Sequence, residues 1–106
     1  MNTYKANLPR VFDSVISTVG INVMLIVLET ARYKIKNKYP EASAIYFSER
    51  GIVFDEIEKL PSEKAILIVE GFLTSVIDIL GRLIGAKKAE KIASQLKFKV
   101  SSASYL

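Results

Sequence analysis

The stretch from Ser62 to Gly85, SEKAILIVEGFLTSVIDILGRLIG, constrains the fold of this chain more than any other segment. On a helical wheel its apolar side chains fill about half of the circumference, with Leu67 as the one exception. They are Ala65, Ile66, Ile68, Val69, Phe72, Leu73, Val76, Ile77, Ile79, Leu80, Leu83 and Ile84. Several of them recur at alternating spacings of three and four, which is typical of helix–helix packing. The pattern predicts a long helix with a very wide buried face, ended by Gly85.

The opposite half of this helix carries a stripe of small side chains. The candidates are Gly71, Thr74, Ser75, Asp78 and Gly81. Small residues let another helix backbone approach closely, and they can also line a narrow groove for a ligand. The sequence favours exposed surface or close helix packing, and it leaves the small-residue groove as an alternative.

Two helices and a hairpin are expected before this segment. Apolar residues at helical spacing predict a helix from Leu8 to Val19, and Gly20 then breaks the chain. A second helix should run from Ile21 to Tyr39 and stop at Pro40. Because residues 21–28 are apolar almost all round, periodicity alone also allows a buried strand there.

The segment 45–54 is rich in β-branched and aromatic residues around a turn that ends at Gly51, which predicts a short hairpin with positive φ at that glycine. A shorter amphipathic helix should follow Gly85, and the tail 101–106 should fray. The expected fold is therefore mainly α, a bundle of about four helices with one short hairpin, forming a single domain over 1–106. An α+β fold with 21–28 as a strand is the alternative.

The composition argues against common forms of catalysis. The chain has no cysteine and no histidine, which removes disulfides, thiolate ligands and the commonest general base. Glu29 and Glu70 interrupt apolar stretches, but the edge of a polar face or a nearby partner explains each of them. We expect no catalytic residue, no metal site and no cofactor.

The net charge of +4 is unevenly distributed along the chain. Basic segments at 32–38 and 87–99 flank an acidic segment at 41–70. Lys87, Lys88 and Lys91 are candidates for phosphate contacts, which makes a basic nucleic-acid-associated protein the alternative function. Nucleic acid is not favoured, because arginine is scarce and few aromatic residues accompany the lysines.

The main functional hypothesis rests on apolar surface. A chain of 106 residues buries a modest share of its surface, and the wide face of the long helix exceeds what one neighbour covers. We therefore expect a non-catalytic binding or regulatory domain that acts as a homodimer and could also bind another protein. The expected dimer interface is Val76, Leu80, Leu83 and Ile84. No membrane span is expected, and a cytoplasmic location is the default.

Overall fold

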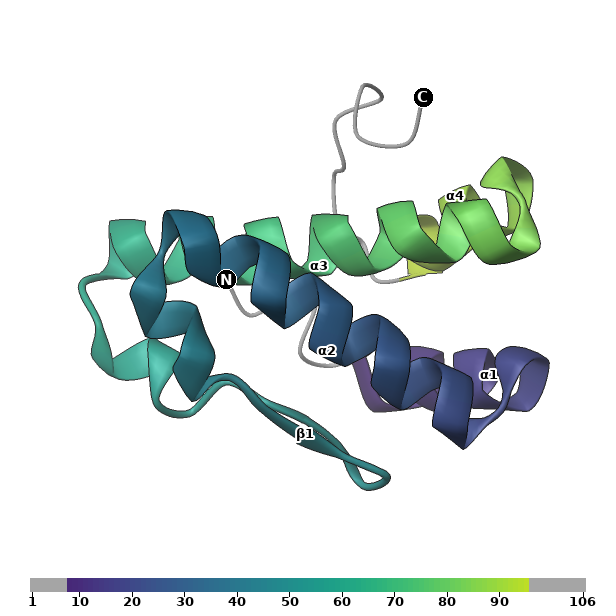
Figure 1. Ribbon diagram of the computed structural model, residues 1–106, viewed down its shortest axis with the longest axis horizontal. Helices are drawn as coiled ribbons and strands as arrows, with labels where there is room; N and C mark the ends of the chain where they lie inside the picture. Colours follow the sequence, from purple (N-terminus) through teal and green to yellow (C-terminus); the bar gives the residue numbers. More distant parts are fainter. Residues whose placement is uncertain (1–7, 96–106) are drawn as a thin grey trace.

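A computed structural model describes residues 8–95 as four helices, two short 3₁₀ helices and one hairpin (Figure 1). The helices are α1 (Leu8–Val19), α2 (Ile21–Lys38), α3 (Ser62–Ile84) and α4 (Ala86–Gln95). Between α2 and α3 lie η1 (Pro40–Ala44), β1 (Tyr46–Ser48), β2 (Gly51–Val53) and η2 (Ile57–Lys59). The mainly α fold with a short hairpin is confirmed. The alternative strand at 21–28 is wrong, because these residues form the first half of α2.

Glycines make the two sharp turns between consecutive helices. Gly20 joins α1 to α2 with φ 89°, and Gly85 joins α3 to α4 with φ 99°. Only glycine adopts such angles at low cost, so each helix pair turns where the sequence places its glycine. Both turns lie at the same end of the molecule, on the right in Figure 1.

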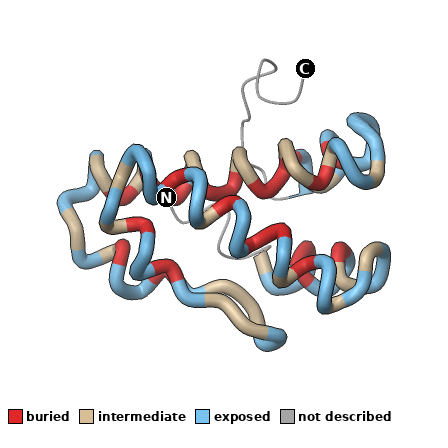
Figure 2. The backbone as a smooth tube through the Cα atoms, in the orientation of Figure 1, coloured by how far each residue is buried: buried red, intermediate tan, exposed pale blue. Residues whose placement is uncertain are grey.

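The long helix α3 lies in the middle of the fold. It packs against both α2 and α4, and in Figure 1 α2 passes in front of it while α4 lies behind it. The buried residues of α1, α2 and α3 face one another, as Figure 2 shows in red. Eight residues of α3 are buried: Ala65, Ile68, Val69, Phe72, Leu73, Val76, Ile77 and Leu80. The predicted apolar face of this helix is thus the centre of the core.

The hairpin packs one of its faces on the helices. Its strands pair antiparallel, with Phe47 opposite Ile52 and Tyr46 opposite Val53. The first pair is half-buried against the core, whereas Tyr46 and Val53 are exposed. Gly51 has φ 131°, as predicted for the end of the turn.

Arg32 of α2 holds the hairpin in place. Its guanidinium donates a hydrogen bond of 3.0 Å to the carbonyl oxygen of Ile45 and lies 4.5 Å from the centre of the Phe47 ring. A planar cation can make both contacts at once, which lysine cannot reproduce.

Within residues 8–95 no single helix is both long and apolar enough to cross a membrane. Helices α1 and α2 reach the length and apolar composition of a membrane span only when they are counted together, and they are bent by 118° relative to each other.

Candidate functional site

The single chain covers most of the apolar face from which a dimer interface was expected. Val76 is 5% exposed and Leu80 is fully buried, so both belong to the core of one copy. Ile84 is half-buried, and Leu83 alone presents a large apolar side chain, at 56% exposure. Of the four residues expected at a dimer interface, only Leu83 and Ile84 are thus accessible at the surface of one copy, and their part in an interface stays a prediction. Helices α1, α2 and α4 together cover the face that seemed too wide for one neighbour.

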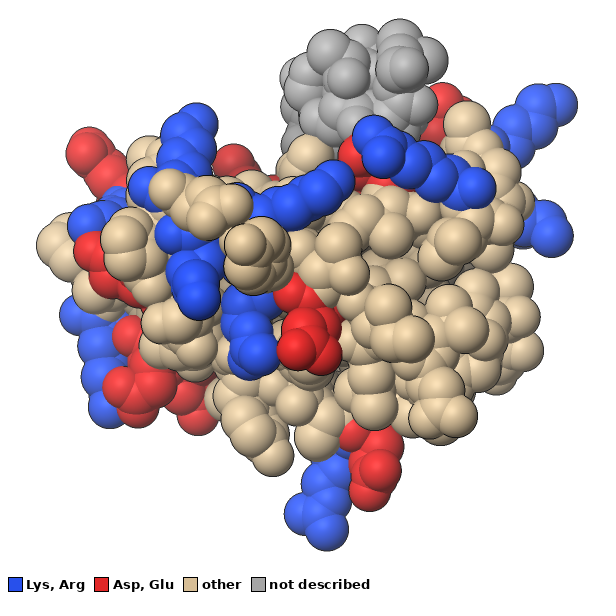
Figure 3. All heavy atoms as spheres, in the orientation of Figure 1, with Lys and Arg blue, Asp and Glu red and all other residues tan. Residues whose placement is uncertain are grey.

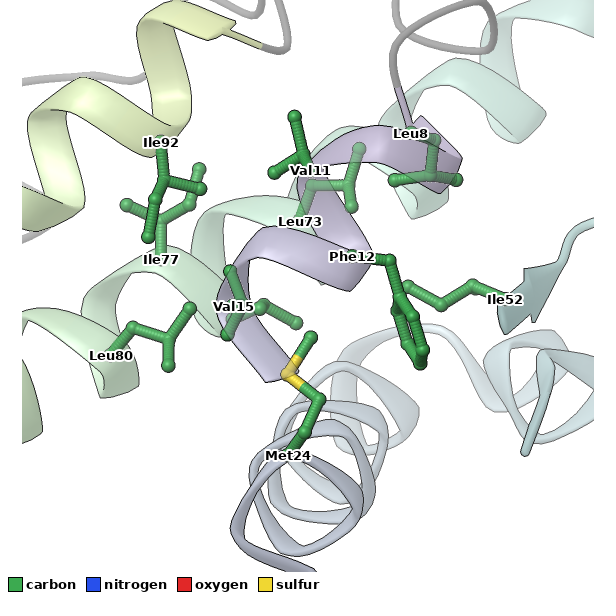
Figure 4. Close-up of a pocket in the computed structure, with 11 residues that line it drawn as sticks. Leu8, Val11, Phe12, Val15, Met24, Ile52, Leu73, Ile77, Leu80 and Ile92 are labelled. Carbon is green, nitrogen blue, oxygen red and sulfur yellow. The ribbon is translucent and has the colours of Figure 1, made fainter. Parts of the chain in front are cut away.

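A small cavity lies where α1 meets the other helices and the hairpin (Figure 4). Its lining is entirely apolar: Leu8, Val11, Phe12, Val15, Met24, Ile52, Leu73, Val76, Ile77, Leu80 and Ile92. The volume is about 20 Å³, close to the space that one water needs, and no polar group is present to bind that water. We interpret this cavity as a packing defect of the core that is too small for a ligand.

The small-residue stripe of α3 serves helix packing at Gly71. A β-carbon on Gly71 would lie 2.6 Å from Cδ1 of Ile35 on α2, so the absent side chain makes room for that isoleucine. Thr74, Ser75, Asp78 and Gly81 are half-buried, and Asp78 pairs with Arg82 at 3.5 Å. At Gly71 the side chain of Ile35 therefore occupies the space beside the helix, and the small-residue groove stays an untested alternative.

The carboxylates that interrupt apolar stretches lie at the surface of the fold. Glu29 and Glu70 are both exposed. Within the described residues no polar or charged side chain is fully buried, and no group of three acids is arranged to hold a metal ion.

Glu41 is the one carboxylate with a clearly altered environment in the described part of the chain. It accepts a hydrogen bond from the ammonium group of Lys64, which joins η1 to the start of α3. This bond, together with a backbone hydrogen bond at Glu41, holds the pKa of the carboxyl below its usual value. The pair connects two segments of the fold, so its role is structural.

A stripe of exposed side chains runs along the outer face of α2. Ile26 and Tyr33 are each 64% exposed, Val23 is 38% exposed, and Thr30 lies between them. The spacing of three, four and three places all four on one side of the helix. We call these four residues the α2 stripe.

The surroundings of the α2 stripe are uncharged over half its length. No charged residue occurs from Ser14 to Leu28. Figure 3 accordingly shows an uncharged area over α1 and the first half of α2, while charged side chains gather over the other end of α2. Contiguous apolar surface of this kind is typical of interaction sites.

The described lysines of the two basic segments lie in separate parts of the structure. Lys34, Lys36 and Lys38 are exposed at the end of α2, on the left in Figure 1, whereas Lys87, Lys88 and Lys91 are exposed on α4, which begins at the right-hand end. The predicted phosphate-contacting lysines therefore do not join the α2 group in one continuous basic surface.

Two features of the surface were not predicted from the sequence. The first is the α2 stripe, which was hidden because residues 21–28 are apolar almost all round and their spacing defines no single exposed face. The second feature is that Ser14 and Thr18 of α1 lie beside Lys88 and Lys91 of α4, which had no local signal because about 70 residues separate them.

Comparison with protein-family models, curated proteins and solved structures finds no match to this chain.

Proposed function

We propose that this protein is a non-catalytic interaction domain that functions as a homodimer formed through the α2 stripe. The observation that carries the proposal is the exposure of Ile26 and Tyr33 on a helix whose opposite face is fully used by the core. An isolated exposed apolar residue needs no explanation, but a regular stripe along a helix matches the seam of a helix pair.

The charges of α2 favour an antiparallel pairing of two copies. Four cations occur in the second half of the helix, between Arg32 and Lys38, and none in the first half. A twofold axis near Leu28 places Val23 opposite the partner's Tyr33, and Ile26 opposite the partner's Thr30. Each basic half then faces a half without cations, whereas a parallel pairing would bring eight cations together. A twofold axis is also the commonest symmetry of protein dimers.

The mass in solution tests the proposal. Light scattering at micromolar concentration should give the native chain twice its monomer mass of 11.8 kDa. The Ile26→Glu variant should have the monomer mass, because a carboxylate would be desolvated at the centre of the seam. Leu67→Glu is the matched control, since Leu67 is 52% exposed on α3 and lies outside the stripe.

Two results would refute the proposal. One is a native monomer at this concentration. The other is an equal loss of dimer in the variant and in its control. Retention of the dimer in Leu67→Glu with its loss in Ile26→Glu assigns the interface to α2.

The basic nucleic-acid-associated alternative has weaker support. Among residues 8–95 the two lysine groups lie apart, with three exposed lysines in each, and phosphate contacts gain strength from a continuous basic surface.

A further inference from the structure

A groove between α1 and α4 combines basic, hydroxyl and apolar side chains. It has a volume of about 260 Å³ and is open to solvent. Its exposed rim consists of Ser14, Thr18, Lys88, Lys91 and Gln95, and its more buried floor of Val15, Ile84 and Ile92. A cationic rim above an apolar floor suits a molecule that has an anionic head and a hydrocarbon body.

Within residues 8–95 no acidic side chain forms an ion pair with the two lysines of this groove. Lys88, Lys91 and Gln95 follow one another at spacings of three and four, so they share one side of α4. Glu90 is two residues from Lys88 and therefore projects from the other side of the helix. No salt bridge engages Lys88 or Lys91 within residues 8–95, and α1 contributes no charge after Asp13.

Apolar surface lies at the same end of the molecule. Leu83 is 56% exposed and directly precedes Ile84 of the groove floor. The α3–α4 turn at Gly85 and the α1–α2 turn at Gly20 both lie at this end in Figure 1, and Figure 3 shows basic side chains projecting beside the former. This end of the fold is thus both apolar and positive.

We propose that this end docks on an anionic lipid bilayer, with a lipid phosphate between Lys88 and Lys91 and with Leu83 inserted among the headgroups. Surface-bound proteins gain affinity from apolar side chains buried at the interface and from lysines near anionic lipids. The groove accommodates a headgroup, and the rest of the lipid stays in the bilayer. Duplex nucleic acid would use the lysines but would leave Leu83 and the apolar floor in water.

Docking does not depend on the proposed dimer. The groove and Leu83 belong to α1, α3 and α4, whereas the dimer is assigned to the outer face of α2. A protein that proves to be monomeric would still present this end to a bilayer.

Vesicle sedimentation tests the electrostatic part of the proposal. The probe is the full chain with vesicles of mixed phosphatidylglycerol and phosphatidylcholine. The Lys88→Gln/Lys91→Gln variant should bind roughly 30-fold more weakly, which corresponds to about fivefold for each lysine near the surface. The matched control is Lys34→Gln/Lys36→Gln, which removes the same charge from exposed positions at the other end and should bind like the native chain.

A second pair of variants tests the apolar part. Leu83→Ser should weaken binding to the same vesicles, whereas Leu67→Ser, which alters an equally exposed leucine of the same helix, should not. Equal effects of a variant and its control would overturn the proposal. So would equal binding to vesicles of phosphatidylcholine alone, or binding to duplex DNA without binding to vesicles.

Discussion

The close approach of Gly71 and Ile35 allows a test in which helix propensity and side-chain packing have opposite effects on stability. Replacement of glycine by alanine inside a helix normally stabilises by about 1 kcal/mol. At Gly71 the new β-carbon would lie 2.6 Å from Cδ1 and 3.4 Å from Cγ1 of Ile35, a residue only 8% exposed. Such overpacking typically costs 1–3 kcal/mol. We therefore expect Gly71→Ala to destabilise the protein by about 1 kcal/mol net.

Shortening the isoleucine should reverse this loss. Ile35→Val removes Cδ1, and alone it should cost about 1 kcal/mol, within the usual range for this truncation. With both changes, the atom nearest to the new β-carbon is the one at the position of Cγ1, about 3.4 Å away. The higher helix propensity of alanine then stabilises the protein without a steric clash. The double variant should be about as stable as the native chain, and the two substitutions should be coupled favourably by about 2 kcal/mol.

Urea denaturation of the four proteins measures this coupling. All four must be compared at one protein concentration, because the unfolding of a dimer depends on concentration. Additive effects within about 0.5 kcal/mol would show that the two residues do not touch. A Gly71→Ala variant more stable than the native chain would show that the space beside the glycine is empty.

Three further predictions concern the contacts of Arg32, the pair of Glu41 with Lys64, and the exposed Leu83. Arg32→Met should lower the unfolding free energy by about 1–3 kcal/mol in urea denaturation, because the hairpin loses a hydrogen bond and the cation over Phe47. The folded-state pKa of Glu41 lies below 4.5, so its pair with Lys64 stabilises above that pH and weakens as pH falls through the folded-state pKa. Thermal unfolding at acidic pH should therefore show a steeper loss for the native chain than for Glu41→Gln. Leu83→Glu should keep the native mass in light scattering and lose affinity for anionic vesicles. Loss of the dimer in this variant would show that the interface includes the end of α3 and not α2 alone.

The helices could be predicted from the sequence because their signals are local. Glycine and proline mark the ends of α1, α2 and α3, and the apolar period of α3 is unbroken for 23 residues. The apolar period does not define how α3 begins: Pro61 precedes the helix, and no side-chain hydrogen bond caps that end. The tail 101–106, which was expected to fray, lies outside the described residues.

The surfaces could not be predicted because they depend on which helices meet. Val76 and Leu83 share the apolar seam of α3, yet the first is buried and the second is exposed, since the neighbouring helices do not cover the end of α3. In α2 the apolar residues surround the helix, so only the packing of Met24 and Leu28 into the core shows that Ile26 faces outward. Periodicity defines a face, and tertiary contacts decide how much of that face is covered.

Disulfide trapping tests the antiparallel α2 pairing most directly, because the native chain contains no cysteine. A tagged chain with Val23→Cys and an untagged chain with Tyr33→Cys would be mixed and oxidised. Because the tag gives the two chains different masses, same-position and mixed dimers can be separated by mass. The antiparallel pairing predicts mainly the mixed dimer, since the two positions lie opposite each other across the twofold axis. Mainly same-position dimers, or no trapped dimer at all, would contradict the proposed interface.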